Sequence, residues 1–291
     1  MPSRRKWRAG SCLRRNSMDL PDPLTKAQAL HVRAGSRTPV QRLIPEETPV
    51  AMVYDGTTHA VMMATPADIR EFALGFSLTE GIVEHPGQIA SCDVIAHDRG
   101  IEARIWLAED RAEALAARRR TLAGPVGCGL CGIDSLDQAV RPLPDLSGVG
   151  PVLDAAQIAA ATDSLRDWQP LHDQSRAVHA AGFLMPGRGV VLAREDVGRH
   201  NALDKLIGAM ALEGVDAGQG AFVLTSRVSV EMVQKCALAG GAVLIAVSAP
   251  TAHALRLAEG AGVTLAAFAR GEGFDLFTHP YRLTDEVSDV A

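Results

Sequence analysis

The stretch that decides the fold is Ala221-Phe222-Val223-Leu224-Thr225-Ser226, followed further on by Ala242-Val243-Leu244-Ile245-Ala246-Val247-Ser248. Both are continuous apolar runs that end in polar residues, and residues 228–239 between them have a helical pattern. Continuous apolar strands that alternate with helices are typical of a largely parallel sheet covered on both faces. More apolar runs and helical patterns extend this alternation, at 178–185, 189–193, 263–269, 199–213 and 251–260. We therefore predict an α/β C-terminal lobe over residues 151–291, with a mostly parallel sheet.

Polar clusters follow the ends of these predicted strands, at 194–201, 225–227, 248–251 and 270–273. In open α/β sheets, ligands bind beyond the carboxyl ends of the strands. Three of the clusters run into predicted helix N-termini, where free N–H groups favour anions such as phosphate. The candidate ligand-binding residues here are Arg199, His200, Ser226 and Arg227. Ordinary helix capping and surface polarity remain the alternative for each loop.

The preceding part of the chain predicts a smaller α+β lobe over residues 38–150. Strands are expected at 50–55 and 59–64 around an Asp-Gly turn, and at 101–107. Between them Thr65 is the expected N-cap of a helix that Gly81 ends. An Ala-rich helix through Arg120 precedes a glycine-rich cysteine loop, and a Pro/Gly/Asp-rich stretch at 143–151 marks the boundary between the lobes. Asp154 and Gln157 have capping-box spacing at the start of the next helix.

Composition limits the function classes. The net charge of -5 over 291 residues argues against a general nucleic-acid binder, and no apolar run is long enough to span a membrane. Five cysteines, three of them scattered, do not form a secreted disulfide framework, so we expect a reducing cytoplasm. We interpret residues 1–37 as a disordered basic tail whose natural start is Met18. Cys92 and Cys236 are expected to be buried packing residues.

The chemistry is expected in Gly127-Cys128-Gly129-Leu130-Cys131-Gly132. Structural zinc needs four ligands, and no second pair of cysteines or histidines exists to complete the site. Deaminase zinc needs a His-x-Glu element, which is also absent. Thiol–disulfide exchange remains open, although a thioredoxin-type pair begins a helix and this stretch reads as a loop. A sulfur carrier is the other interpretation, because a persulfide needs an accessible thiolate and room for a donor protein. Two incidental thiols in a turn are the simplest alternative.

Several motifs in one order resemble the FdhD family, the formate dehydrogenase accessory sulfurtransferases. They cover the chain from about residue 45 to 283 and are found at Ala64–Gly81, Gly127–Gly132, Glu195–Lys205, Ser226–Lys235, Phe268–Gly271 and Thr278–Pro280. The resemblance implies a C-terminal lobe similar to the three-layer cytidine deaminase fold. It also implies a homodimer with no permanently bound metal.

The resemblance further implies a function. Cys128 would receive sulfur from a cysteine desulfurase as a persulfide, with Cys131 assisting. The sulfur would pass to the molybdenum or tungsten bis-guanine-dinucleotide pterin cofactor before its insertion into the formate dehydrogenase catalytic subunit. The segment that would contact this cofactor is Phe268, Ala269, Arg270, Gly271, Glu272 and Gly273, in which Glu272 departs from what a polyanion site requires. A thiol–disulfide oxidoreductase and a non-catalytic cofactor chaperone are the competing functions.

Overall fold

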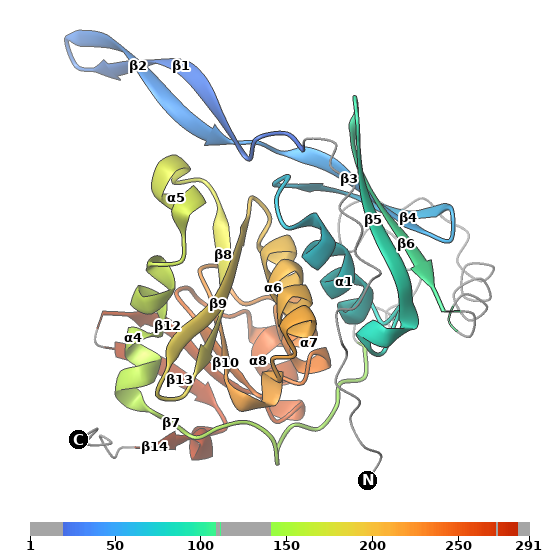
Figure 1. The fold of residues 1–291 in the computed structure, drawn as a ribbon. Coiled ribbons are helices and arrows are strands. Elements are labelled where there is room, and N and C mark those ends of the chain that lie inside the picture. Colours follow the sequence, from blue (N-terminus) through green and yellow to red (C-terminus); the bar gives the residue numbers. More distant parts are fainter. Residues whose placement is uncertain (1–19, 109–110, 112–140, 272, 285–291) are drawn as a thin grey trace.

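The computed structural model describes residues 20–108, 111, 141–271 and 273–284. An N-terminal lobe, a larger C-terminal lobe and a projecting hairpin make up this part of the chain (Figure 1). The N-terminal lobe is a four-stranded sheet in the order β4-β3-β6-β5. Its strands are β3 (Thr48–Tyr54), β4 (Thr57–Ala64), β5 (Ile89–His97) and β6 (Gly100–Leu107). Helix α1 (Ile69–Thr79) packs against this sheet and completes the core of the lobe. The strands that the sequence predicts in this lobe are confirmed as β3, β4 and β6.

The C-terminal lobe contains a six-stranded sheet in the order β13-β12-β11-β10-β8-β9. Its strands are β8 (His179–Met185), β9 (Gly189–Asp196), β10 (Ala221–Leu224), β11 (Val243–Ala246), β12 (Thr264–Arg270) and β13 (Gly273–Thr278). Only β10–β11 and β11–β12 pair in parallel, so the prediction of a mostly parallel sheet is wrong. The runs at 178–185 and 189–193 form an antiparallel hairpin, because the short turn between them is far too small for the crossover that parallel strands need.

Helices cover both faces of this sheet, as predicted. Helix α4 (Ala155–Arg166) packs on one face, and α6 (Arg199–Glu213), α7 (Val230–Leu238) and α8 (Ala252–Gly260) pack on the other. Alternate residues of β10 separate the two cores: Phe222 lies with α6 and α7, and Val223 lies with α4. The predicted capping box of α4 is confirmed, since Gln157 N donates to Asp154 Oδ1 over 2.6 Å. The remaining short elements are η1 (Pro86–Gln88), β7 (Leu153–Asp154), α5 (Pro170–Ser175), η2 (Ala217–Gln219), η3 (Pro280–Arg282) and β14 (Leu283–Thr284).

The start of α1 differs from the prediction. The helix begins at Ile69, and its N-cap position is Asp68, which has a left-handed φ of 53°. Thr65 is fully buried and makes its hydrogen bonds with the other lobe: its N–H donates to Asp196 Oδ2, and its Oγ1 accepts from Val197 N, both over 3.0 Å. Thr65 is therefore a contact between the lobes and not a helix cap.

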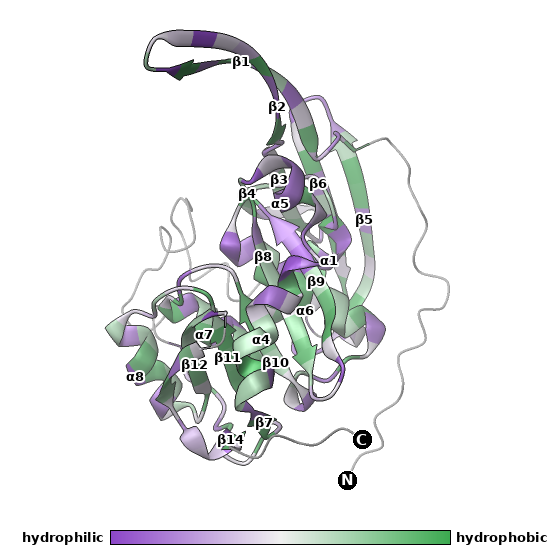
Figure 2. Cartoon of the chain, turned by 90° about the vertical axis from the view of Figure 1, so that its left-hand side faces the viewer, coloured by the Kyte–Doolittle hydropathy of each residue, from purple (hydrophilic) through white to green (hydrophobic). Residues whose placement is uncertain are grey.

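Residues 24–37, which the sequence analysis assigned to a disordered tail, form part of a β-hairpin instead. Strands β1 (Leu24–Arg33) and β2 (Ser36–Pro45) pair along their whole length and turn at Gly35, whose φ is +80°. The hairpin extends away from both lobes (Figure 1). Polar and apolar residues are mixed along both strands without a regular period of two, which is why the sequence pattern did not reveal the hairpin (Figure 2). Residues 1–19, including Met18, lie outside the described residues.

The lobes are joined by the crossing of α1 and α6, at two glycines. A Cβ on Gly75 would lie 1.8 Å from the carbonyl oxygen of Asp204, and a Cβ on Gly208 would lie 1.9 Å from the carbonyl oxygen of Glu71. Real Cβ atoms do not approach backbone oxygens this closely, so neither position has room for a side chain. The missing side chains allow the two helix backbones to touch.

Gly208→Ala is therefore expected to destabilise the protein by about 3 kcal/mol or more, because a backbone carbonyl cannot move aside as a flexible side chain can. Urea unfolding measures this loss. Gly260→Ala is the matched control: it is also a helical glycine, no heavy atom lies within 4 Å of its added Cβ, and its stability should change by less than about 1 kcal/mol. Equal stabilities for the two variants would contradict the account of the crossing.

Candidate functional site

The four polar clusters predicted at strand ends do lie at one edge of the six-stranded sheet. β10, β11 and β12 run in the same direction and end at this edge. β8 runs the other way, with Ala181 opposite Leu224, so β8 begins there. β9 ends there as well, because Asp196 pairs with His179 at the start of β8. We call this row of loops the strand-end edge; it brings Arg199, His200, Ser226, Arg227 and Arg270 to one side of the sheet.

At the β9 end of the strand-end edge, α6 begins directly after Gly198. No side chain caps this helix terminus. His200 Nε2 lies 2.6 Å from Glu231 Oε2, and this close contact lowers the pKa of Glu231. The Nε of Arg199 is buried and has no hydrogen-bond partner among the described residues. Sequence reasoning placed Arg199 and His200 here but missed Glu231, which holds the histidine.

At the end of β10, Ser226 is buried and Arg227 is exposed. The Ser226 hydroxyl donates to the carbonyl oxygen of Arg227 over 3.0 Å, so it shapes the loop and is not a free donor. Helix α7 follows, again without a side-chain cap, and the Oγ of Ser229 at its N-cap is buried without a partner among the described residues. Both α6 and α7 thus begin without a side-chain cap, and Arg199 Nε and Ser229 Oγ have no hydrogen-bond partner among the described residues. The N–H groups and dipoles at such helix termini favour an anion at this edge.

His179 lies between these two helix termini. Its Nδ1 is 3.5 Å from Thr225 Oγ1. Burial lowers the pKa of His179, and the positive charge of Arg199 adds to the effect. Burial is the main cause of this shift; the smaller contribution of Arg199 comes from a positive charge at this edge, which also favours an anion.

The β12–β13 turn carries the predicted cofactor segment. Ala269 is fully buried, whereas Arg270 and Gly273 are exposed, and Glu272 lies outside the described residues. Phe268 has a left-handed φ of 54°, which is uncommon for a bulky residue, at a register shift between β12 and β13. Its half-exposed ring lies 6.3 Å from the ring of Phe277, which the sequence did not indicate. The two partly exposed rings form an aromatic surface on β12 and β13.

The dimensions of the strand-end edge set the size of a ligand that could touch all of it. The strands that lead to Arg270 and to Arg199, β12 and β9, are four strand positions apart. At the usual spacing this is about 19 Å. A ligand that reached both arginines would need the length of a dinucleotide and not of a single phosphate.

Cys128 and Cys131 lie outside the described residues, as does the predicted helix through Arg120, but the residues that flank the cysteine segment are fixed. Arg111 donates to the carbonyl oxygen of Ile82 over 3.2 Å and forms an ion pair with Glu84 over 3.1 Å. Arg141 donates to the carbonyl oxygen of Thr79 over 2.9 Å and pairs with Glu80. Both anchors lie on residues 79–84, directly after α1. The segment that holds the two thiols therefore leaves and rejoins the body at one place.

The two cysteines among the described residues, Cys92 and Cys236, are buried, as predicted. Burial raises the pKa of Cys92 to about 12 and raises that of Cys236 as well. A thiol with so high a pKa is almost wholly protonated at neutral pH and is a poor nucleophile. Among the described residues, no group of three or more His, Cys, Asp or Glu side chains is arranged to hold a metal ion.

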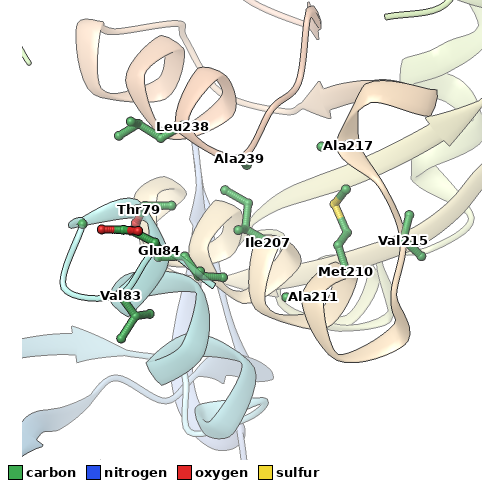
Figure 3. Close-up of a pocket in the computed structure, with 12 residues that line it drawn as sticks. Thr79, Val83, Glu84, Ile207, Met210, Ala211, Val215, Ala217, Leu238 and Ala239 are labelled. Atoms are coloured by element: carbon green, nitrogen blue, oxygen red, sulfur yellow. The ribbon is translucent and has the colours of Figure 1, made fainter. Parts of the chain in front are cut away.

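An apolar cavity of about 340 Å³ lies next to the anchors of the cysteine segment (Figure 3). It is formed by the end of α1, the second half of α6 and the end of α7. Its wall includes Thr79 and Glu84, and otherwise consists mainly of small and aliphatic side chains, among them Leu78, Ile207, Met210, Val215 and Leu238.

None of the helices in the described part of the chain is long and apolar enough to cross a bilayer.

Comparison with known proteins places this arrangement in a family. The sequence model of the FdhD/NarQ family matches residues 45–284. The chain belongs to the FdhD/NarQ family. A sulfur carrier protein FdhD of Agrobacterium fabrum is 52% identical over 87% of this chain and 93% of its own length. One of Brucella abortus biovar 1 is 54% identical over 84% and 91%. A crystal structure of a formate dehydrogenase accessory protein from Desulfotalea psychrophila is similar, with a TM-score of 0.70, 25% identity and coverage of 90% of this chain and 100% of that one.

In this FdhD/NarQ chain two buried lysines hold the lobes together, and sequence reasoning missed both. Lys205 Nζ lies 2.7 Å from Asp196 Oδ2, with both side chains fully buried, and donates to the carbonyl oxygen of Thr65. Lys235 Nζ lies 2.9 Å from Asp204 and from Thr79 Oγ1. The available signal was a lysine inside an otherwise apolar helical pattern, since a charged side chain is seldom fully buried without a partner.

Around Lys235 the anchor of the cysteine segment and the lobe interface are one network. Burial alone would lower the pKa of Lys235, but the charges of Asp204 and Glu80 outweigh it and raise that pKa. Burial would likewise raise the pKa of Glu80, but Lys235 and Arg141 outweigh it and lower that pKa. Asp204 differs from Glu80, because burial outweighs Lys235 and Thr79 and raises the pKa of Asp204. The loss of stability in acid is therefore expected from Glu80.

Glu80→Gln is expected to flatten the dependence of stability on pH in the acid range. A carboxylate whose pKa is lower in the folded state stabilises the fold above its unfolded pKa, near 4.5, and this stabilisation is lost as the pH falls through the lower folded value. The free energy of unfolding in urea, measured between about pH 6 and about pH 3, tests this. Glu84→Gln, at an exposed carboxylate of the same loop, should keep the wild-type slope. A wild-type slope in Glu80→Gln would contradict the role of Glu80.

Proposed function

We propose that this protein is a sulfur carrier that receives sulfur from a cysteine desulfurase as a persulfide on Cys128. It transfers this sulfur to the molybdenum or tungsten bis-guanine-dinucleotide pterin cofactor, which formate dehydrogenase needs for activity. The observation that carries the proposal is membership of the FdhD/NarQ family, with relatives named sulfur carrier proteins that are about half identical over most of both chains. The site of this reaction is the cytoplasm, where thiols stay reduced.

The loading step is a thiol exchange. The Cys128 thiolate attacks the outer sulfur of the donor persulfide, a new sulfur–sulfur bond forms on Cys128, and the donor cysteine leaves as its thiolate. The buried Cys92 and Cys236 cannot compete in this step because their thiols remain protonated. Cys128 is instead flanked by Gly127 and Gly129, which leave room for a protein donor.

The delivery step needs two electrons if sulfur is to reach the metal as sulfide. We assign these electrons to Cys131: its thiolate attacks the inner sulfur on Cys128, the outer sulfur leaves as hydrosulfide, and a Cys128–Cys131 disulfide remains. Atoms and electrons balance without another reductant in that turnover, and the disulfide is then reduced by a cellular dithiol. The three-residue spacing of the pair supports this assignment.

The fixed ends of the cysteine segment are compatible with delivery to the strand-end edge. The anchors lie beside the second half of α6, and Arg199 begins the same helix. Arg199 and Met210 are about 17 Å apart along the helix axis. Cys128 is 13 residues before Arg141, a length of chain that reaches up to about 43 Å. Chain length therefore permits Cys128 to reach the edge.

We propose that the strand-end edge holds the cofactor through its guanine nucleotides. Arg270, Arg227 and the uncapped termini of α6 and α7 favour the phosphates, and the Phe268–Phe277 surface offers a face for guanine stacking. The 19 Å spacing of the arginine-bearing strands suits an extended, multiply charged ligand. The C-terminal lobe's similarity to cytidine deaminases remains a prediction from the family resemblance.

Incubation with a cysteine desulfurase and cysteine is expected to add roughly 32 Da, one sulfur atom, to the wild type, and the addition should disappear on reduction. Cys128→Ala should show no such adduct and should not activate formate dehydrogenase. Cys92→Ala removes a buried thiol and should load as the wild type does. Intact-protein mass spectrometry measures the adduct on the wild type, Cys128→Ala and Cys92→Ala.

The alternatives give different masses and activities. Loading of Cys128→Ala to the wild-type level would overturn the assignment. A Cys128–Cys131 disulfide without any adduct would identify a thiol–disulfide oxidoreductase. Full activation of formate dehydrogenase by a variant lacking both thiols would identify a cofactor chaperone.

Arg270→Ala is expected to weaken the binding of guanosine diphosphate by about tenfold or more, because a charge-assisted hydrogen bond to phosphate is lost. Calorimetric titration measures the affinity. Arg188→Ala is the matched control, since it removes the same charge from the β8–β9 turn at the opposite edge of the sheet. Sulfur loading should be unchanged in both variants. An unchanged nucleotide affinity in Arg270→Ala would remove the β12–β13 turn from the site.

A further inference from the structure

Delivery of sulfur from Cys128 needs a proton as well as two electrons. A persulfide is more acidic than the corresponding thiol, so its outer sulfur carries a negative charge at neutral pH. When the Cys131 thiolate attacks the inner sulfur, the bond between the two sulfurs breaks and its electron pair moves to the outer one. A doubly charged sulfide is a poor leaving group, and a proton lets it depart as hydrosulfide. An acid is therefore expected where the sulfur is delivered.

Three histidines lie close together at the β9 end of the strand-end edge, because the charges of His172 and His200 both act on His179. The ring of His200 is held by Glu231, with Nε2 2.6 Å from the carboxylate. The ring of His172 lies on the short helix α5, and its Nδ1 is 3.1 Å from the carbonyl oxygen of Val178. His179, at the start of β8, is the histidine that lies between the N-termini of α6 and α7.

The contacts of His179 leave one ring nitrogen available. Thr225 Oγ1 donates to the carbonyl oxygen of Ala180 over 3.2 Å and accepts from Ala180 N over 2.9 Å. Since the hydroxyl proton of Thr225 is used in this way, the long contact of 3.5 Å with His179 is compatible only with donation by Nδ1. The neutral ring then has its lone pair on Nε2, which has no hydrogen bond to the described part of the chain. The side chain is partly exposed, so Nε2 can exchange protons with water and with a ligand.

We propose that His179 is a catalytic residue of the delivery step and that its Nε2 gives a proton to the outer sulfur of the Cys128 persulfide. The Cys131 thiolate forms a disulfide with Cys128, the bond between the inner and outer sulfurs breaks, and the outer sulfur leaves as hydrosulfide with the proton from His179. The imidazole is left neutral and regains a proton from water. Atoms, electrons and charge balance in this step. The inference rests on the proposed function, to which it adds the source of the proton.

The surroundings of His179 suit a proton donor. Burial lowers the pKa of His179, and the positive charge of Arg199 lowers it further. His172 and His200 act in the same direction, and Asp196 acts in the opposite one. A lowered pKa makes the imidazolium a stronger acid. The persulfide and the phosphates of the cofactor bring negative charge to the edge, and this charge favours the protonated ring when the substrate is in place.

His179→Gln tests the proposal, because glutamine keeps a side-chain N–H for Thr225 but cannot supply a proton to a sulfide. Sulfur loading of Cys128 and the affinity for guanosine diphosphate should stay within about threefold of the wild type. When the loaded variant meets the bis-guanine-dinucleotide cofactor in a single turnover, the Cys128–Cys131 disulfide should form about a hundredfold more slowly. His97→Gln is the matched control, since this exposed histidine of the N-terminal lobe contacts Glu102, and it should deliver at the wild-type rate.

His179→Ala adds a measurement that a merely structural role would not affect. Added imidazole should raise its delivery rate at least about tenfold, because a free imidazolium can replace the missing proton donor. Delivery at the wild-type rate by His179→Gln, a nucleotide affinity that falls in parallel with the rate, or slow delivery that imidazole does not restore would each overturn the assignment of His179. A wild type that takes up no sulfur would overturn the proposed function itself, and this assignment with it, so the two failures are distinguishable.

Discussion

The contact between α1 and α6 determines how the rest of the molecule is arranged. Gly75 and Gly208 let the two helix backbones touch, and the buried pairs Lys205–Asp196 and Lys235–Asp204 lie on either side of the crossing. Both pairs belong to the C-terminal lobe, but each lysine also reaches the N-terminal lobe: Lys205 donates to the carbonyl oxygen of Thr65, and Lys235 contacts Thr79 and Glu80. These contacts between the lobes are satisfied in only one register of α1 on α6. The crossing thereby fixes the N-terminal lobe against the sheet that carries the strand-end edge.

This crossing also separates the two chemical regions. The end of α1, with Thr79 and Glu80, joins the Lys235 network and anchors Arg141 at one end of the cysteine segment. The N-terminus of α6, with Arg199 and His200, belongs to the strand-end edge. Helix α6 thus has the contacts of Arg141 beside its second half and the strand-end edge at its start.

Much of this could be predicted from local patterns. Apolar runs that alternate with helical periods predict the α/β lobe, and polar residues after these runs predict the strand-end edge. Both predictions are possible because they depend on residues that are close in sequence. The directions of β8 and β9 were predicted wrongly, because an apolar pattern does not distinguish an antiparallel hairpin from a parallel pair. The short turn between the two strands, which leaves no room for a crossover, decides the direction. Thr65 has the local features of an N-cap, yet Asp196 and Val197, more than 130 residues later, take its hydrogen bonds. Such distant pairings, like Lys205 with Asp196, leave only a faint signal in sequence.

The central claim is that sulfur held on Cys128 passes to a nucleotide-bearing cofactor and not to solvent. The most direct measurement loads the protein with sulfur-35 persulfide, removes the donor and adds the bis-guanine-dinucleotide cofactor in a single turnover. The account predicts that label moves to the cofactor while an equal amount of Cys128–Cys131 disulfide appears. Label that stays on the protein, or is released as free sulfide at the same rate without cofactor, would contradict it.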